Sequence, residues 1–597
     1  MANSNPSTST ANRAKRMTKM QALDLMQRLL DEEDNSSSDD NLDSELSDND
    51  VDDDDREYQP SAAKHARLNG KGKGKQNNNK AYRTAHTAAV VDESEPDSDN
   101  NSVDFINNDN ACAVSVADVM ACDEAEENVS IGSSLFRSAG SGIRASLDEN
   151  STPLDCLLTL LTTDIIDSLV ENINLYSVEK IQKNIPLRKR STLSEWQPMT
   201  REICFQFLSV VIAMGITPKH DIKDYWSTAN HKFTPWFKVM FPRTKFLLVY
   251  QSMLHASEPK AQGQAKIEPS VNNLVAKFQS AFCPYGKLFV DEMVIGFKGR
   301  FHAKQYNAAK PHKYHKKTFG LCDSVTGYVY NLLIYFGAKT AYNPELDPTS
   351  THAVKVFSTL LQGVESYHHL FANRFYTSLP LIKFFLSMKL NYTGMVNKNR
   401  KGLPQQLKQQ PAIFGTPRWL VNNEQNILCV SWRDKKSKKK PCILLTTNES
   451  STFEERQEGS RKVQKPSPIY SYNMSMNGCD RLDQMVSYYS NHNCKTKKWW
   501  KKVFTWIVEV TQVNAHILYM LSHRAAPKRM SLAHFKDKLI QQLTALSGHE
   551  VPTDMLIAVA RRPGKRPTLS DSFVGADHLV DYAGADRQCV QCSKKKI

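Results

Sequence analysis

The chain has 597 residues, which exceeds the about 100–200 residues of a single domain and predicts several modules or one core with a large insertion. Apolar residues make up 40% of the sequence and charged residues 23%, as is usual for a globular protein. The longest apolar run, 205–216, is shorter than the roughly 20 residues that span a membrane, and the N-terminus has no apolar signal segment. We therefore expect a protein that is neither secreted nor inserted in a membrane.

The net charge of +14 is unevenly distributed along the chain. Residues 1–150 carry a net charge of −15 and residues 151–597 a net charge of +29. An acidic tail before a strongly basic body is typical of nucleic-acid-binding proteins, although a merely solvated basic surface has the same charge. The twelve cysteines are scattered singly, apart from Cys589 and Cys592, which favours a reducing compartment.

The first 150 residues are predicted to form a disordered acidic tail. Residues 31–57 contain 15 acids among Ser and Asn, and such a stretch cannot bury enough apolar area to offset chain entropy. The folded body is predicted to begin at Thr152 and Pro153, a helix cap followed by a first-turn proline. Apolar residues at helical spacing follow, with further helices at 200–214 and 246–254, so we expect 152–285 to be mostly helical.

Strand-like segments then predict an α/β core with mixed strand pairing. The expected strands are 287–297, 319–323, 328–336, 369–375 and 392–396, and 378–390 is expected to be a helix with Pro in its first turn. We assign 286–396 to the first part of the core, 397–470 to a basic, irregular insertion with strand-like 427–432 and 442–447, and 471–484 to the second part of the core. Residues 485–545 are expected to be helical, and 546–597 to be a linker with a short Cys-containing tail.

Two acids in this core are candidates for chemistry. Asp291 lies inside an apolar strand, where a carboxylate is costly unless it is paired, binds a cation or ends the strand at the surface. Asp480 follows Gly478 and opens a helix, so taken alone it is most simply a helix cap.

A series of short motifs links these acids to a known family. In chain order they are Asp224–Ser227, Val290–Glu292 with Gly296–Arg300, Lys310–Tyr314, Leu321–Ser324, Phe375–Ser378, Asn399–Gly402, Gly478–Gln484 and Lys498–Trp500. Through these motifs the chain resembles the piggyBac family of DNA transposases and the host proteins derived from them, from about Leu154 to Cys592. The resemblance implies an RNase H-like core flanked by a helical dimerisation and DNA-binding domain at 152–285 and 485–545.

The resemblance also implies three catalytic aspartates that hold two Mg²⁺ (or Mn²⁺) ions for phosphoryl transfer on DNA. The first maps onto Asp291 and the third onto Asp480, but the second is replaced by Asn373, which offers one neutral carbonyl oxygen where a charge is needed. Glu365 and Asp483 are the acids that could take its place. We expect metal binding and strand cleavage to be badly impaired.

The C-terminus departs from the family as well. Members often end in a Cys-rich module that binds zinc and reads transposon ends, whereas this chain has Cys589 and Cys592 with His578 upstream. Tetrahedral zinc needs four ligands, so we expect an unmetallated remnant of the module.

Basic residues mark the expected contacts with DNA phosphates. One cluster surrounds Trp499 and Trp500 at the start of a predicted helix, and a second follows the Asp291 strand; the residues are Lys495, Lys497, Lys498, Lys501 and Lys502, and Lys298 and Arg300. For Trp500 itself a place in the core is the favoured interpretation.

We therefore expect a nuclear protein that forms homodimers, binds double-stranded DNA and has lost transposase activity. The basic clusters at 13–19, 71–75 and 561–566 are typical of nuclear import signals. Two alternatives remain open. One is an active cut-and-paste transposase that cleaves TTAA-like targets with divalent metal, the site being completed by another acid. The other is a scaffold that binds protein partners through its acidic tail and dimerising body.

Overall fold

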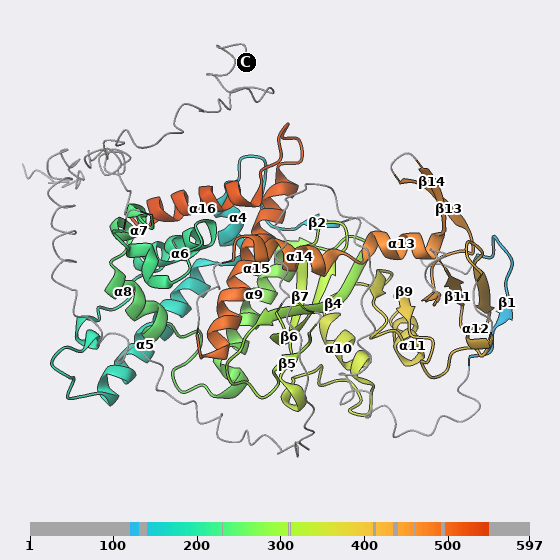
Figure 1. Ribbon diagram of the computed structural model, residues 1–597, viewed down its shortest axis with the longest axis horizontal. Coiled ribbons are helices and arrows are strands. Elements are labelled where there is room, and N and C mark those ends of the chain that lie inside the picture. The colour runs from blue at the N-terminus through green and yellow to red at the C-terminus, as the bar shows by residue number, and fades with distance from the viewer. Residues whose placement is uncertain are drawn as a thin grey trace, which may run out of the picture.

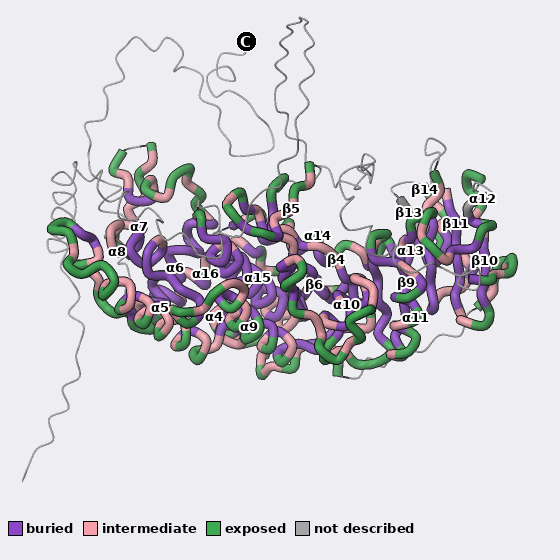
Figure 2. The backbone as a smooth tube through the Cα atoms, turned by 90° about the horizontal axis from the view of Figure 1, so that it is seen from below, coloured by how far each residue is buried: buried purple, intermediate pink, exposed green. Residues whose placement is uncertain are grey.

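The computed structural model has an elongated body, with helices at one end, a sheet in the middle and a smaller strand-rich part at the other end (Figure 1). It describes residues 120–130, 136, 140–229, 231–308, 310, 312–409, 413–433, 440–458, 461–490 and 496–548. Buried backbone runs through the inside along the whole length, and exposed backbone lies on the outside (Figure 2). No helix in this described part is long and apolar enough to cross a membrane.

The region before the central strands is helical, as predicted. Its α-helices are α4 (Pro153–Leu160), α5 (Thr163–Lys183), α6 (Arg201–Ile216), α7 (Pro235–Met240), α8 (Arg243–Leu247) and α9 (Glu268–Ala281); its shorter turns are η4 (Thr192–Glu195), η5 (Ile222–Trp226), the π-helical η6 (Leu248–Met253) and η7 (Gly263–Lys266). The predicted cap of α4 is confirmed: the Thr152 side chain accepts a hydrogen bond from the backbone N–H of Asp155, and the Asp155 carboxylate accepts one from the N–H of Thr152.

The centre of the molecule is a mixed sheet built around β4 (Lys287–Gly296). On one side β4 pairs antiparallel with β6 (Tyr314–Asp323), which also pairs with β5 (Gln305–Tyr306) and β7 (Val329–Ile334). On the other side it pairs parallel with β8 (His369–Ala372), and β8 pairs parallel with β9 (Asn391–Val396). The helices α10 (His352–Leu360) and α11 (Leu379–Ser387) provide the crossovers, and η8 (Gly337–Lys339) follows β7. The predicted α/β character is confirmed.

The segment that we expected to be irregular extends this same sheet. Strands β10 (Arg418–Asn422), β11 (Ile427–Trp432) and β12 (Cys442–Thr446) form an antiparallel meander, and β12 pairs with β9. The sequence predicted β11 and β12 but not β10, nor the hairpin of β13 (Phe453–Glu458) and β14 (Arg461–Pro466), nor the short α12 (Gln406–Gln409). Strands β13 and β14 are rich in polar residues, so local hydrophobicity does not reveal them, and β10 has only three consecutive apolar residues, Trp419–Val421.

The predicted disordered tail is too long at its C-terminal end. Residues 1–119 lie outside the described part of the chain. Residues 120–130, however, add β1 (Asp123–Glu124) to the edge of the sheet beside β10, and β2 (Gly142–Ile143) pairs with β3 (Phe282–Cys283). These pairings fix the segment through backbone hydrogen bonds, which its polar composition does not indicate.

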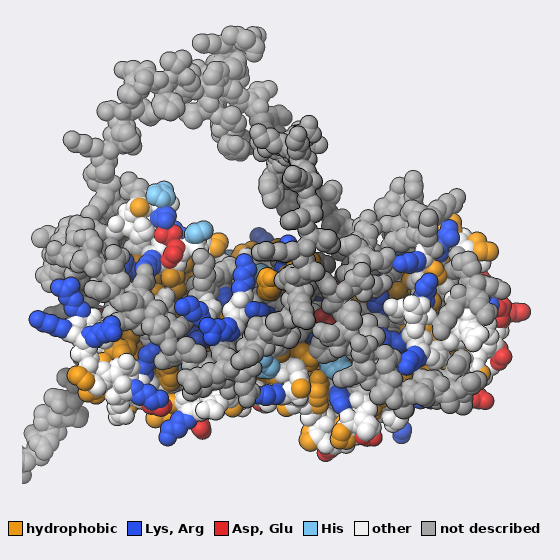
Figure 3. Space-filling view, turned by 60° about the horizontal axis from the view of Figure 1, so that its bottom comes forward, with side chains coloured by type: hydrophobic (Ala, Val, Ile, Leu, Met, Phe, Trp, Pro, Cys, Tyr) orange, Lys and Arg blue, Asp and Glu red, His pale blue; other side chains and the backbone are white. Residues whose placement is uncertain are grey.

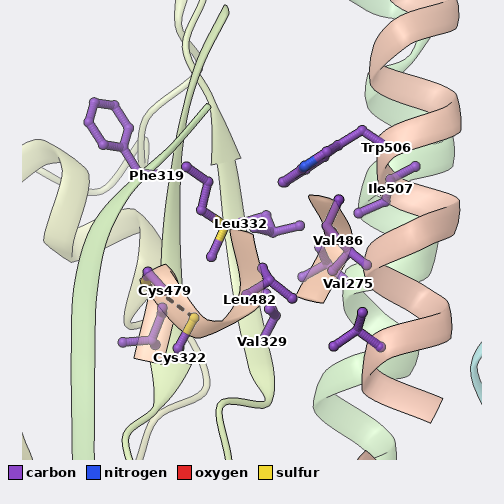
Figure 4. Close-up of a cluster of buried hydrophobic side chains, with 14 of the residues drawn as sticks. Val275, Phe319, Cys322, Val329, Leu332, Cys479, Leu482, Val486, Trp506 and Ile507 are labelled. Carbon is purple, nitrogen blue, oxygen red and sulfur yellow. Dashed lines mark hydrogen bonds between the residues drawn. The ribbon is translucent and has the colours of Figure 1, made fainter. Parts of the chain in front are cut away.

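The C-terminal helices return to the N-terminal ones. They are α13 (Ser467–Ser475), α14 (Gly478–Tyr488), α15 (Trp499–Ser522) and α16 (Leu532–Leu546). Helix α15 packs on α4 and α9, and α16 packs on α6, so segments more than 300 residues apart share one helical body. In Figure 4, Trp506 and Ile507 of α15 lie near Val486 of α14 and Leu332 of β7, which joins this body to the sheet.

Candidate functional site

Strand pairing brings two of the predicted site residues together. Val290 of β4 is the register partner of Ala372 of β8, and because the strands are parallel, the next residues, Asp291 and Asn373, lie side by side at the same end of the sheet. The Asn373 side-chain amide Nδ2 donates a hydrogen bond to Oδ1 of Asp291 at 2.8 Å. The Asn373 carbonyl Oδ1 accepts one from the backbone N–H of Phe375 at 3.0 Å. Both ends of the amide are thus engaged within the protein.

The second part of the site comes from α14, which packs on β4 and β6. Asp480 and Asp483 are three residues apart and therefore lie on the same face of this helix. Burial raises the pKa of Asp483 to about 7, with a further contribution from the negative charge of Asp480, while Lys310 opposes the shift. Burial likewise raises the pKa of Asp291 to about 7, helped by Glu292 and Asp480. The negative charge of Asp480 therefore acts on the carboxyl groups of both Asp291 and Asp483.

Of the two acids that could replace the missing aspartate, the structure brings only one to the site. Glu365 lies before the start of β8, whereas Asn373 follows its end, and the Glu365 carboxylate pairs with Arg144 at 3.4 Å. Asp483 lies one turn from Asp480, as described above. Of the two possible substitutes, Glu365 is therefore not brought to Asn373, and Asp483 stays the candidate.

The residues present do not fit a complete two-metal centre. Such a centre needs several anionic oxygens directed at the same point, and Asn373 instead directs an amide N–H at Asp291. Throughout the described ranges, no group of three or more His, Cys, Asp or Glu side chains is arranged to hold a metal ion. Cys589 and Cys592, predicted not to form a zinc site, lie outside the described residues.

Positively charged side chains lie near the carboxylates of the site. Lys317 forms a short ion pair with Glu292, and its ammonium lies 4.7 Å from the centre of the exposed Phe375 ring. Arg400 donates through Nη2 to the backbone oxygens of Arg374 at 3.1 Å and Phe375 at 2.6 Å, which holds the loop after Asn373. We call Lys310, Arg374 and Arg400, together with the exposed Lys398 and Lys401 that flank Arg400 in the sequence, the basic rim of the site. Lys310, Arg400 and Lys401 lie in the sequence motifs, but without the fold nothing indicated that Lys310 and Arg400 lie near Asp291 and Asn373.

The predicted DNA-contacting lysines divide into exposed and buried ones. Lys298, Arg300 and Lys497 are exposed, and Lys502 is partly exposed. Lys501, in contrast, is 4% exposed, and its ammonium donates to the backbone oxygens of Tyr250 at 3.0 Å and Gln251. Lys498 is 7% exposed, Trp500 is in the core as expected, and Lys495 lies outside the described residues.

Lys501 is therefore not a surface residue, and the prediction of a DNA contact there is wrong. It lies on the face of α15 that packs against η6, where it satisfies helix-end carbonyls. Elsewhere the surface agrees with the basic composition: Figure 3 shows Lys and Arg side chains spread along most of the length of one face.

Comparisons with known proteins point to one family. A family model described as Transposase IS4 matches residues 152–516. The human PiggyBac transposable element-derived protein 3 is 23% identical over 463 residues, which cover 74% of this chain and 72% of that protein. The human PiggyBac transposable element-derived protein 5 is 21% identical over 428 residues, or 69% of this chain and 79% of that protein.

A solved structure has the same fold. It is a cryo-EM structure of piggyBac transposase in a synaptic complex with hairpin DNA, and it aligns with a TM-score of 0.58 at 22% sequence identity. The alignment covers 71% of this chain and 88% of that chain. The mixed α/β architecture with its large central sheet is thus that of a solved transposase.

Proposed function

Because the chain belongs to the piggyBac family of transposases and transposase-derived proteins, we propose that it is a nuclear DNA-binding protein whose catalytic centre is impaired. Double-stranded DNA is the proposed ligand and a homodimer the proposed assembly. The strand order β7-β6-β4-β8-β9, antiparallel on one side of β4 and parallel on the other, supports an RNase H-like core. The likeness to a transposase solved with hairpin DNA supports DNA as the ligand.

One observation carries the proposal of impaired catalysis, namely the hydrogen bond from Asn373 to Asp291. Members of this transposase family use divalent metals, which stabilise the attacking and leaving oxygens of the DNA strand when they are bound by a complete set of acids. Here the amide satisfies the Asp291 carboxylate without a cation and contributes no charge of its own. The pKa of Asp291, raised to about 7 by burial, further lowers its negative charge at neutral pH.

The basic rim is the part of the site whose proposed role, binding DNA phosphates, does not depend on a metal ion. Lys398 and Lys401 are exposed, and Arg374 is exposed beside Asn373. For each phosphate that a protein cation neutralises, the logarithm of the DNA-binding constant falls by about 0.9 for each tenfold rise in salt concentration. A rim of this kind binds duplex DNA without needing the metal.

A strand-cleavage assay on the full-length protein and on Asn373→Asp tests the proposal. Supercoiled plasmid is incubated with each protein in Mg²⁺ or Mn²⁺, and binding of a duplex oligonucleotide is measured in parallel without metal. We expect both proteins to bind the duplex and only Asn373→Asp to nick the plasmid. Asn373→Leu, which has a similar volume and no carboxylate, is the matched control and should stay inactive. Cleavage by the unaltered protein would contradict the proposal, and so would a failure of both proteins to bind the duplex.

An active transposase remains a second candidate because Asp483 lies near Asp480 and interacts electrostatically with it. In that case Asp483 would supply the missing charge. The unaltered protein would then cleave DNA, and Asp483→Asn would abolish that cleavage while leaving duplex binding unchanged.

A further inference from the structure

Two thiols from distant parts of the chain meet between the central sheet and α14. Cys322 belongs to β6, and Cys479 belongs to the first turn of α14, 157 positions later. Their Sγ atoms lie 3.3 Å apart, and the two side chains point toward each other (Figure 4). Cys322 is 0% exposed and Cys479 is 1% exposed, and both are free thiols in this structure.

This contact lies next to the residues of the candidate site. Cys479 directly precedes Asp480 on α14, and its Sγ is also 3.7 Å from the backbone oxygen of Gly320. Gly320 is in turn the register partner of Asp291 in the β4–β6 pair. A covalent bond between the two thiols would therefore fix the helix that carries Asp480 to the strand that pairs with the strand of Asp291.

The helix start approaches β6 closely enough for the thiols to be joined. A Cβ added at Gly478 would lie 3.2 Å from the Cβ of Cys322, so the lack of a side chain at this position allows the close approach. An S–S bond requires the two sulfurs to move about 1.2 Å closer, which small rotations of the side chains provide. No side chain caps the N-terminus of α14, so opening of its first turn breaks few hydrogen bonds and admits a small molecule to Cys479.

We propose that Cys322 and Cys479 form a reversible disulfide when the protein meets hydrogen peroxide, and that this bond fixes α14 to β6. One thiolate attacks a peroxide oxygen and becomes a sulfenic acid, while the O–O bond breaks and the hydroxide that leaves takes up the thiol proton. The second sulfur then attacks the first, forms the S–S bond and expels hydroxide, which leaves as water with the second thiol proton. Two thiols and one hydrogen peroxide thus give one disulfide and two water molecules. Because both thiols are buried, we expect them to react more slowly than an exposed cysteine.

The disulfide would change how firmly α14 is held without changing the residues of the site. In the thiol form the helix is held on the sheet by packing, which includes the buried side chains of Leu482 and Val486 (Figure 4). A covalent link adds a constraint between segments 157 positions apart and holds the first turn of the helix in place. Oxidation therefore limits the motion of Asp480 relative to Asp291.

Formation of the bond is tested on the unaltered full-length protein. The reduced protein is incubated with hydrogen peroxide, the remaining thiols are alkylated, and the protein is digested without reductant for mass spectrometry. We expect a pair of peptides joined through Cys322 and Cys479 that separates on treatment with dithiothreitol. Sulfinic acids on the two cysteines without a link, links only between other cysteines such as the interacting pair Cys122 and Cys429, or no link at all would overturn the inference.

The effect of the bond on α14 is tested by native-state hydrogen exchange and by thermal unfolding. We expect the amides of α14 to exchange about tenfold more slowly in the oxidised protein, and Tm to rise by about 5 °C. Cys322→Ala should lose both effects, and Cys479→Ala tests the same contact from its other side. Cys204→Ala, at a buried cysteine of α6, is the matched control and should keep both. Unchanged exchange of α14 in the linked protein, or slower exchange that persists in both contact variants, would overturn the inference.

Discussion

Lys316 of β6 is a cation enclosed by aromatic rings. Its ammonium lies 3.5 Å from the centre of the Phe301 ring, 4.1 Å from that of Phe336 and 4.0 Å from that of Trp499. The residue is 1% exposed, and its Nζ has no hydrogen-bond partner. Burial lowers the pKa of Lys316 well below its usual value. Cation–π attraction and the cost of desolvation therefore oppose each other at one atom.

We expect Lys316→Met to raise the free energy of unfolding by about 1–3 kcal/mol at neutral pH. The thioether keeps the length of the side chain and its contact with the rings, while the cost of burying an amine without a hydrogen bond is removed. Urea unfolding of both proteins measures the difference. The exposed Lys313, changed to Met, is the control and should alter stability by less than about 0.5 kcal/mol. A clear loss of stability in Lys316→Met would mean that the aromatic rings stabilise the ammonium more than burial destabilises it.

Single residues also mark the limit of what the sequence predicts at the site. The resemblance leads us to expect an aspartate where Asn373 stands, but the direction of the Asn373 amide depends on the register of β4 and β8. The burial of Lys501 depends on η6, which precedes it by some 250 residues. Helical periodicity fixes which residues share a face, but it does not say which face meets another part of the chain.

At the scale of elements, a buried lysine links α16 to the end of α14. Lys536 is 1% exposed, lies on the α16 helix that packs on α6, and donates through Nζ to the Tyr489 oxygen at 2.9 Å. Burial lowers the pKa of Lys536 to about 8, and the negative charge of Glu509 on α15 partly opposes the shift. The folded state thus releases this proton more readily than the unfolded chain does.

We expect this lysine to make the protein more stable as the pH rises from about 8 to about 10.5. In that window Lys536 is neutral in the folded state and protonated in the unfolded state, so the unfolding free energy increases with pH by about 2–3 kcal/mol. Below pH 8 both states carry the proton and the contribution is constant. Urea unfolding across this range should show a smaller rise in Lys536→Met. The exposed Lys538, changed to Met, should keep the full rise; the same slope in all three proteins would contradict the assignment.

The sequence predicts elements best where a local signal is strong. The cap at Thr152, the Pro-started helix α11 and the apolar strands β4, β7 and β9 all have such signals, and all form near the predicted positions. Strand β1 and the polar hairpin of β13 and β14 have none, because their backbone partners, not their side chains, hold them in place. The parallel pairing of β8 with β4 also joins distant segments, so no local pattern reveals it.

At the scale of the whole molecule, one sheet connects the candidate site with the 397–470 region. Its order is β1-β10-β11-β12-β9-β8-β4-β6-β5, with β7 paired to β6, so the expected insertion continues the core sheet without a gap. Strand β12 is the junction: its Leu445 lies opposite Gly394 of β9 on one side and Cys429 of β11 on the other. Leu445 is completely buried.

We expect Leu445→Ala to destabilise the whole sheet rather than the 397–470 region alone. Truncating a buried Leu removes its transfer free energy and leaves a cavity, at a cost of about 2–5 kcal/mol. Because hydrogen-bonded strands run from β11 to β4 without interruption, the loss should appear in both. Native-state hydrogen exchange should therefore show faster exchange of the most protected amides of β4 as well as those of β11. Val325→Ala, at a position that is 61% exposed, should change neither. Faster exchange in β11 with unchanged β4 amides would mean that β10–β12 unfold as a separate unit, which opens independently of the candidate site.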